Sequence, residues 1–262
     1  MRTDLVSEPG APGRPNEDFA GVGLPACGQG GCAIVLDGVT PPRGGTGCLH
    51  SVHWFTARLG GALTELTVSC RDLTLAEILA RAIRRTADAH ADTCDLSHPR
   101  TPQATVALAR WSAAEVEYLV LSDAALLLCG PDGGVTPVLD DRLARLPPAA
   151  LATESLVDTR LRNKEGGFFT AAADPAVHAR AVTGVLPRHA VRALAALTDG
   201  AARWTETFGA GDWTALFEVV AKEGARSLVE RVRELEAADR ERRAFLGRGK
   251  THDDATVVYA EL

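Results

Sequence analysis

Acidic residues stand beside short apolar runs along nearly the whole chain, and no other feature restricts the possible folds as much. They are Glu17-Asp18, Asp37-Gly38, Asp123, Asp199-Gly200 and Asp253-Asp254. Short apolar runs are typical of buried strands, and strand ends can bring residues distant in sequence to one point. Carboxylates gathered at one point repel one another unless a cation lies among them, and oxygen ligands suit hard ions such as Mg2+ or Mn2+. The sequence therefore predicts a site for several metal ions, assembled from both ends of one domain.

The length of the chain, 262 residues, allows one large domain or two small ones. No repeat, low-complexity segment or linker divides it, so we expect a single domain over residues 1–262. Residues 7–15 are rich in Pro and Gly, and we expect residues 1–13 to form an irregular lead-in. A hydrophobic content of 46% is enough for a sizeable core.

The charge and the terminal sequence limit the classes of partner. The formal net charge is -6, which argues against nonspecific binding to nucleic acid, because such binding needs a basic face. Residues 1–8 contain no apolar segment of a signal peptide, and no run of about 18 apolar residues marks a membrane span. We therefore expect a cytoplasmic protein without nucleic-acid or membrane partners.

The chain has six cysteines and no C-x-x-C pair, so the sequence does not favour a zinc ribbon. We expect reduced thiols. His50 and His53 have helical i, i+3 spacing and could share a metal ion, but the pattern supplies no third ligand. A position on a helix surface or in a core is the favoured interpretation of both histidines.

The apolar pattern predicts an alternation of strands and helices. Residues 191–198 are rich in alanine and favour a helix by propensity, but they precede Asp199-Gly200, so we predict a strand. The expected strands are 32–36, 104–109, 116–121, 125–129, 135–139, 168–169, 191–198 and 256–262. The expected helices are 48–66, 73–91 (capped by Asp72 or Thr74), 212–223 and 225–245. Residues 140–165 have no clear assignment.

Taken singly, most of the acidic motifs have an ordinary explanation. Asp-Gly is a common turn dipeptide, and Glu17-Asp18 could be solvated surface. Asp123 is less ordinary, because apolar runs flank it on both sides and a carboxylate in such a stretch needs a partner, a turn or a metal. The order of the motifs is more informative than any one of them.

The motifs Asn16-Glu17-Asp18, Leu36-Asp37-Gly38, Ser122-Asp123, Thr198-Asp199-Gly200 and Asp253-Asp254-Ala255-Thr256 stand in the order of those in the metal-dependent protein phosphatase 2C family. The chain resembles a divergent bacterial member of this family over residues 14–259. The resemblance implies an α+β fold: a four-layer α-β-β-α sandwich in which helices flank two mostly antiparallel sheets.

The resemblance also implies roles for individual residues. Asp37 would bridge two ions, the Gly38 carbonyl would be a further ligand, and Asp199 and Asp253 would complete one ion's shell. Glu17 would hold the other ion, with Asp18 in support, and Asp123 would join Asp199 at a third position. Arg14 would bind the substrate phosphate, although it lies three residues before Glu17 where the family usually has four. Asp37, Asp199 and Asp253 would thus carry the catalysis.

The resemblance predicts a Mg2+- or Mn2+-dependent phosphoprotein phosphatase with two or three ions, in which a water bridged by two ions attacks the phosphorus directly. Where the family has D-G-x-G-G, this chain has Asp37-Gly38-Val39-Thr40-Pro41, and nothing in this loop can replace the histidine that eukaryotic members place there as a proton donor. Two alternatives stay open at this point: a phosphatase of a small phosphorylated metabolite, and a noncatalytic regulatory module on the same fold.

Overall fold

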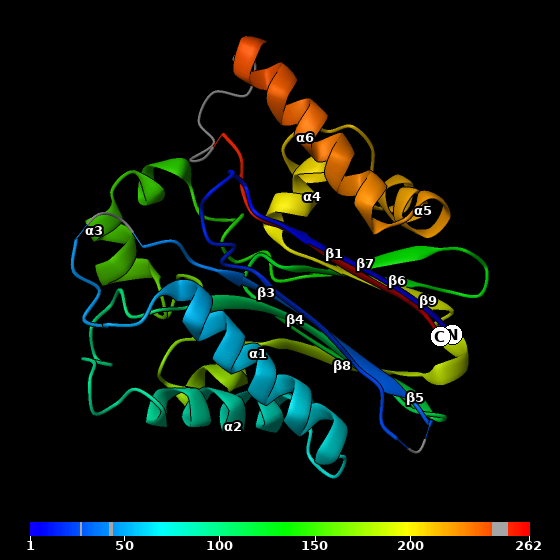
Figure 1. Cartoon of the computed structure of the whole chain (residues 1–262), viewed down its shortest axis with the longest axis horizontal. Coiled ribbons are helices and arrows are strands. Elements are labelled where there is room, and N and C mark those ends of the chain that lie inside the picture. Colours follow the sequence, from blue (N-terminus) through cyan, green and yellow to red (C-terminus); the bar gives the residue numbers. More distant parts are fainter. Residues whose placement is uncertain (27, 42–43, 243–250) are drawn as a thin grey trace.

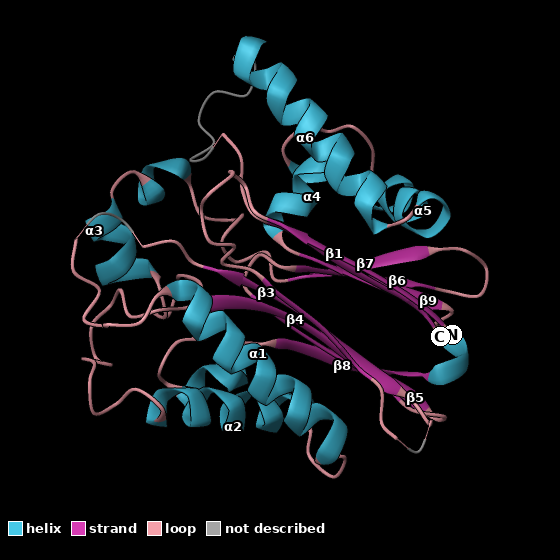
Figure 2. Ribbon diagram, viewed as in Figure 1, coloured by secondary structure: helices cyan, strands magenta, loops and turns pink. Residues whose placement is uncertain are grey.

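The computed structural model describes residues 1–26, 28–41, 44–242 and 251–262, and of residues 240–242 it describes the main chain alone. Two five-stranded sheets lie face to face between two layers of helices (Figures 1 and 2). Every strand pair in both sheets is antiparallel. The predicted α-β-β-α sandwich is confirmed.

One sheet joins the two ends of the chain. In spatial order its strands are β1 (Arg2–Glu8), β10 (Ala255–Glu261), β9 (Ala193–Leu197), β6 (Ala125–Cys129) and β7 (Val135–Leu139). The first and last strands pair from Arg2↔Glu261 to Glu8↔Ala255, so the termini lie side by side (Figure 1).

The other sheet is built from β2 (Phe19–Gly23), β3 (Gly31–Gly38), β4 (Ala104–Trp111), β5 (Glu115–Leu121) and β8 (Val182–Pro187), in that spatial order. Strand β3 lies inside the sheet and pairs Asp37 with Thr105 of β4. The end of β3 is therefore held rigidly, which fixes the position of the Asp37 side chain.

The helices cover the outer faces of the two sheets (Figure 2). The sheet that contains β3 and β4 is covered by helices α1 (Val52–Ser69) and α2 (Leu75–Asp88). The sheet that contains β1 and β10 is covered by α4 (Asp199–Glu206), α5 (Trp213–Glu223) and α6 (Ala225–Arg242). A segment with little regular structure connects β7 to β8 and contains α3 (Glu154–Leu156) and helical turns at Pro148–Leu151, Val157–Leu161 and Pro175–Arg180. A further helical turn, Arg188–Ala190, follows β8. None of the helices in the described ranges is long and apolar enough to cross a membrane.

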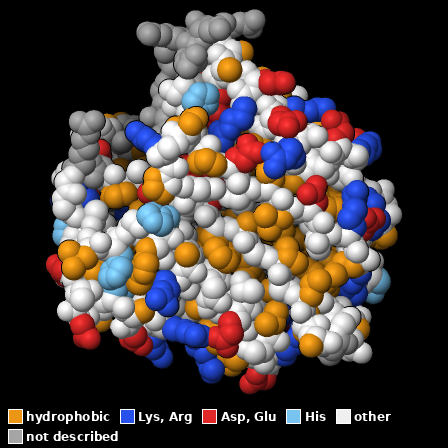
Figure 3. Space-filling model, in the orientation of Figure 1, with side chains coloured by type: hydrophobic (Ala, Val, Ile, Leu, Met, Phe, Trp, Pro, Cys, Tyr) orange, Lys and Arg blue, Asp and Glu red, His pale blue; other side chains and the backbone are white. Residues whose placement is uncertain are grey.

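Three apolar clusters account for the layers. One cluster packs the sheet that contains β1 and β10 against α4, α5 and α6. Another packs the sheet that contains β3 and β4 against α1 and α2, and the third lies between the sheets. Along β3, Ile34 and Leu36 face the helices, whereas Ala33 and Val35 face the opposite sheet. Burial on both faces explains why this strand has a continuous apolar sequence rather than an alternating one. Figure 3 shows apolar side chains across the middle of one face, where Figure 1 draws the edges of the sheets.

Several local predictions are confirmed. Residues 193–197 form strand β9 between β10 and β6, so burial between neighbouring strands overrides the helix propensity of an alanine-rich run. Thr74 caps α2 in a complete capping box with Glu77. The predicted helix 225–245 is α6, which extends over Ala225–Arg242, and residues 243–245 lie outside the described residues.

The prediction of an irregular lead-in over residues 1–13 was wrong, because Arg2–Glu8 forms strand β1. This strand lies at a sheet edge and buries only Val6, so it lacks the apolar pattern that would reveal it in sequence. It pairs with β10 from Arg2 to Glu8, and only the stretch after Glu8 is a loop.

Other differences concern where elements begin and pair. Helix α1 begins at Val52 with Ser51 as its cap, so residues 48–51 precede it. Residues 168–169 form only an isolated bridge between Phe168 and Arg162. Strands β5 and β6 are close in sequence but belong to different sheets, so the turn at Ser122-Asp123 carries the chain from one sheet to the other.

Candidate metal centre

A cavity of about 380 Å³ lies where the two sheets and the segment after β7 meet. Four of the predicted carboxylates line it, and each comes from a different part of the chain. They are Asp37, Asp123, Asp199 and Asp253. The structure therefore brings together side chains that are up to 216 positions apart in sequence, as the pattern of acidic residues predicted.

Asp37 and Gly38 occupy the end of β3. A Cβ atom on Gly38 would lie 2.4 Å from Val52 Cγ1 and 2.5 Å from the Glu17 carbonyl oxygen, so a larger residue does not fit here. The absence of a side chain lets the main chain of Glu17 approach the end of β3. The Thr40 hydroxyl donates to the Glu17 carboxylate, which holds that side chain beside the loop that follows Asp37.

Asp199 begins helix α4, directly after strand β9. The preceding Thr198 donates its hydroxyl to Asp18 Oδ2 at 3.0 Å and accepts the Thr256 N–H at 3.0 Å. A Cβ on Gly200 would lie 1.9 Å from the Asp254 carbonyl oxygen. These contacts fix the start of α4 against the start of β10, so Asp199, Asp18 and the Asp253-Asp254 pair are held together.

Asp123 follows Ser122, which has a left-handed backbone conformation (φ 67°) that residues other than glycine rarely adopt. The Ser122 N–H donates to Asp140 Oδ2 at 2.8 Å, and Asp140 is itself buried. Strain held in place by a buried hydrogen bond is a feature of functional sites. Here it marks the turn that directs Asp123 into the cavity.

Asp253 and Asp254 have different surroundings. Asp253 Oδ2 accepts a hydrogen bond from Arg203 at 2.8 Å. The two oxygens of Asp254 accept the N–H groups of Gly10 and Glu17, each at 2.7 Å. A carboxylate can accept both bonds because each of its two oxygens is an acceptor. Asp254 therefore ties the N-terminal acidic motif to the C-terminal one.

Burial and mutual repulsion raise the pKa values of the acidic groups at the cavity. Burial, assisted by the charges of Asp123 and Asp253, raises the pKa of Asp199 to about 7. Burial also raises the pKa of Asp18 to about 7, with Asp254 and Asp199 adding to the shift. The pKa of Asp37 is raised well above its usual value by burial and by the charges of Asp199 and Asp18. A cluster of oxygen donors that repel one another fits hard divalent cations such as Mg2+ and Mn2+.

The structure does not bring every predicted residue to the cavity. Glu17 and Asp18 stand next to it without lining it, and Arg14 is exposed and outside the lining. Two other guanidinium groups line the cavity, those of Arg162 and Arg203. Neither arginine was predicted from the sequence. Arg162 lies in the segment that has no periodic pattern, and Arg203 lies in α4, which was not expected as a helix.

These pKa shifts give the metal-free protein a pH dependence of defined sign. A carboxyl whose pKa is raised in the folded state stabilises the fold at low pH, and that contribution is lost as the pH rises through the folded value. For Asp18 and Asp199 the window runs from 3.8 to about 7. We expect the melting temperature in EDTA to fall across this window and saturating Mn2+ to remove most of the fall.

Differential scanning fluorimetry at closely spaced pH values measures this effect. Asp199→Asn removes one of the titrating groups and should flatten the curve in EDTA. Asp72→Asn, a change at an exposed aspartate, should leave the curve unchanged. A wild-type melting temperature that stays level or rises over the same window would contradict the electrostatic description.

The two-sheet sandwich and the carboxylate-lined cavity between its layers define the class: a metal-dependent protein phosphatase. The family model described as protein phosphatase 2C matches residues 11–238, and the chain belongs to this family. The resemblance predicted from the order of the acidic motifs is therefore confirmed. Comparison with curated proteins finds no match.

Solved structures of bacterial phosphatases share the fold. Serine/threonine phosphatase Stp1 from Staphylococcus aureus aligns with a TM-score of 0.61 at 12% identity, over 100% of this chain and 95% of that one. The serine/threonine phosphatase PstP/Ppp of Mycobacterium tuberculosis aligns with a TM-score of 0.60 at 18% identity, over 100% and 98%. The catalytic domain of PstP in complex with two manganese ions aligns with a TM-score of 0.57 at 19% identity, over 99% and 97%.

Proposed function

We propose that this protein removes phosphate from phosphoserine or phosphothreonine in other proteins, using two or three Mg2+ or Mn2+ ions. The observation that carries the proposal is the convergence of Asp37, Asp123, Asp199 and Asp253 on one cavity in a member of the protein phosphatase 2C family. We also propose that residues 1–262 act as one domain. The pairing of β1 with β10 along its whole length supports this.

Asp37, Asp199 and Asp253, with the Gly38 carbonyl, would hold the principal ions, and Asp123 would serve a further one. Glu17 and Asp18 would support them from the adjoining N-terminal segment. When bound, the ions would lower the pKa of a water molecule and neutralise charge on the phosphoryl group. Asp254 would hold the main chain of Glu17 near Asp253, because its carboxylate accepts the Glu17 N–H.

On the substrate side, we assign the phosphate contact to Arg162 in place of Arg14. Arg162 lines the cavity, and its side chain is 17% exposed. The nearest oxygen of Asp158 lies 3.8 Å from Arg162 Nε, and the same carboxylate receives a shorter bond of 2.6 Å from Arg100. Arg162 therefore has donors to offer an anionic substrate. The apolar walls, formed by Leu143, Leu151, Val157 and Phe168, would contact the residues around a phosphorylated side chain.

Phosphate release tests the proposal directly. The purified protein is incubated with a phosphothreonine peptide, a phosphoserine peptide, p-nitrophenyl phosphate and a panel of phosphorylated metabolites, with Mn2+ or with EDTA. We expect release from the peptides that requires Mn2+. Release from metabolites alone would overturn the substrate assignment, and no release from any compound by a protein that still binds Mn2+ would favour the noncatalytic alternative.

Replacing Arg162 by alanine should reduce kcat/KM for the phosphopeptide by roughly 10- to 100-fold, because a hydrogen bond to a charged group contributes about 1.5–3 kcal/mol. Steady-state kinetics with the peptide measure the loss. Arg14→Ala is the matched control, since its side chain is exposed and outside the cavity. A larger loss for Arg14→Ala than for Arg162→Ala would restore Arg14 as the phosphate ligand.

A further inference from the structure

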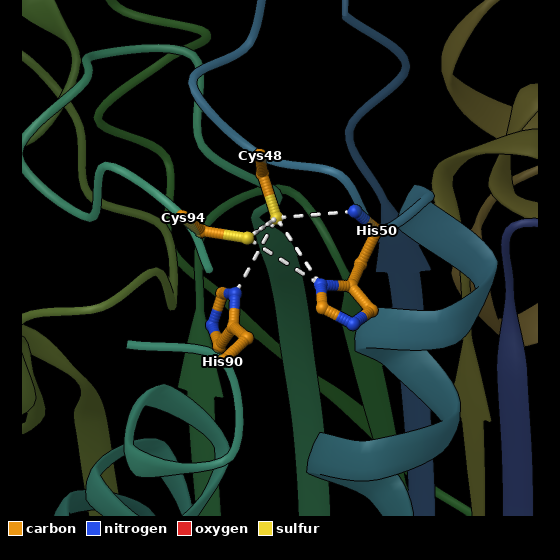
Figure 4. A group of neighbouring side chains, drawn as sticks. All are labelled: Cys48, His50, His90 and Cys94. Atoms are coloured by element: carbon orange, nitrogen blue, oxygen red, sulfur yellow. Dashed lines mark hydrogen bonds between the residues drawn. The ribbon is translucent and has the colours of Figure 1, made fainter. Parts of the chain in front are cut away.

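A second group of metal-binding side chain types lies outside the carboxylate cavity. It consists of Cys48, His50, His90 and Cys94, the set we name the Cys/His cluster. Two members come from the segment before α1 and two from the segment after α2. In Figure 4 the two sulfur atoms lie next to each other, and a nitrogen of each imidazole ring points toward them. One nitrogen or sulfur atom from each of the four residues lies within 4.8 Å of all the others.

Three sulfur–nitrogen distances in the Cys/His cluster are close to those expected for a tetrahedral zinc site. With Zn–S bonds of about 2.3 Å and Zn–N bonds of about 2.0–2.1 Å, such a site separates sulfur from nitrogen by about 3.5 Å. The Cys48 sulfur lies 3.4 Å from His90 Nδ1 and 3.7 Å from His50 Nδ1, and the Cys94 sulfur lies 3.4 Å from His50 Nδ1. The two sulfurs are 2.9 Å apart, so they would separate by about 1 Å to reach tetrahedral spacing.

The backbone around the Cys/His cluster is arranged to support thiolates. The Leu49 N–H donates to the Cys94 sulfur at 3.3 Å, and the His50 N–H donates to the Cys48 sulfur at 3.4 Å. Main-chain donors of this kind orient metal-binding sulfurs and stabilise their negative charge. The Asp95 N–H also bonds to the Gly47 carbonyl at 2.7 Å, which joins the two segments independently of the side chains.

The histidines are held by their surroundings. The ring centroid of Trp54 lies 4.0 Å from that of His50 and 5.3 Å from that of His90. His90 is 2% exposed, and its Nε2 has no hydrogen-bond partner among the described residues. Nδ1 of His90 faces a sulfur atom. A thiol is a weak hydrogen-bonding partner for this buried Nδ1, and a metal ion at the cluster would give the same nitrogen a stronger one.

We propose that Cys48, His50, His90 and Cys94 bind one Zn2+ ion as a structural site. Two thiolates and two imidazoles suit zinc, and four protein ligands leave no position open for a substrate or a catalytic water. Each cysteine would lose its thiol proton to solvent on binding. The oxygen donors of the carboxylate cavity suit harder ions, so the two sites would select different metals.

The location indicates what the ion would stabilise. It would join the segment that leads from Asp37 to α1 with the segment that leads from α2 to β4. These segments already meet where the Val39 N–H bonds to the Gln103 carbonyl at 2.9 Å, and Val39 and Thr40 line the carboxylate cavity. Zinc at the Cys/His cluster would therefore fix the loop that forms one wall of that cavity.

The Cys/His cluster was not predicted from the sequence, because its two halves, at Cys48-x-His50 and His90-x3-Cys94, are separated by a helical hairpin. The i, i+3 spacing of His50 and His53 was the only histidine pattern considered, and a helix-surface or core position was favoured for both. The structure separates these two: His53 lies on α1 and contacts Ser51 at 3.1 Å, whereas His50 precedes the helix. The preference for a surface or core position holds for His53, and His50 belongs to the cluster.

Zinc content tests the proposal. The protein is purified under reducing conditions without chelator, desalted to remove loosely bound ions, and analysed by elemental mass spectrometry. We expect one zinc per chain in the wild type and in Asp37→Asn, and loss of zinc in the double variant Cys48→Ser/Cys94→Ser. Cys70→Ser, at a cysteine outside the cluster, should retain it. Zinc that is absent from the wild type, or unchanged in the double variant, overturns the proposal.

A second measurement does not depend on how the double variant folds. Replacing zinc by Co2+ in the wild type should produce the visible bands of tetrahedral cobalt and a thiolate-to-metal charge-transfer band. His50→Ala should weaken Co2+ binding, and His53→Ala should leave it unchanged. A Cys48–Cys94 disulfide in the intact protein, found by mass spectrometry under nonreducing conditions together with no cobalt spectrum, would replace the zinc site by a covalent link.

Discussion

Replacing Asp37 by asparagine should reduce phosphate release by on the order of 10³-fold or more, because the ions' contribution to the transition state is several kcal/mol and this residue is assigned to hold them. The same variant should raise the melting temperature of the metal-free protein. Asp37 is ionised only at the expense of burial and of repulsion from Asp199 and Asp18, and asparagine removes that charge without removing volume.

The two effects are measured on one preparation, by peptide dephosphorylation with Mn2+ and by thermal unfolding in EDTA. Asp72→Asn is the matched control at an exposed site and should change neither. An Asp37→Asn variant that keeps wild-type activity would remove Asp37 from the mechanism. A variant that loses activity and also melts at a lower temperature in EDTA would show that the carboxylate is structural.

Replacing Arg203 by alanine should destabilise the protein by about 3–5 kcal/mol, as expected when one partner of a buried ion pair is removed. Arg203 donates to Glu236 at 2.6 Å and to Asp253 at 2.8 Å, and the Glu236 side chain is 0% exposed. In the variant, the buried Glu236 carboxylate would lose one of the positive charges that offset its loss of hydration. In a domain of this size the melting temperature should fall by roughly 10 °C.

Arg233→Ala is the comparison for this prediction. Arg233 also contacts Glu236, at 2.8 Å, but its side chain is 23% exposed, so water can replace part of the lost interaction and the fall should be smaller. Thermal unfolding in Mn2+ and in EDTA measures both variants. A melting temperature for Arg203→Ala within about 2 °C of the wild type would contradict the structural role assigned to this pair.

The sequence was sufficient to predict the features that follow an apolar pattern or stand in a fixed order. Double-sided burial of β3 and β9 gives continuous apolar runs that end at Asp37 and before Asp199. The acidic motifs could therefore be placed at strand ends, and their order led to the family. Propensity alone would have made 193–197 a helix, and the Asp199-Gly200 pair that follows corrected that assignment.

The missed features have no such pattern. Strand β1 lies at an edge and buries one side chain, so its sequence carries no strand signal even though it pairs with β10 throughout. Arg162 reaches the cavity from a segment without periodicity. The Cys/His cluster depends on two loops that meet only after α1 and α2 have packed, and sequence spacing does not record that contact.

We propose that the carboxylate cavity is a centre for divalent cations, and this assignment underlies the proposed activity. The most direct measurement is anomalous X-ray scattering at the manganese edge from crystals grown with Mn2+. We expect at least two manganese peaks in the cavity, with Asp37 adjacent to both and Asp199 and Asp253 adjacent to one. A cavity without manganese in crystals that contain the ion elsewhere would contradict the assignment of these residues as metal ligands.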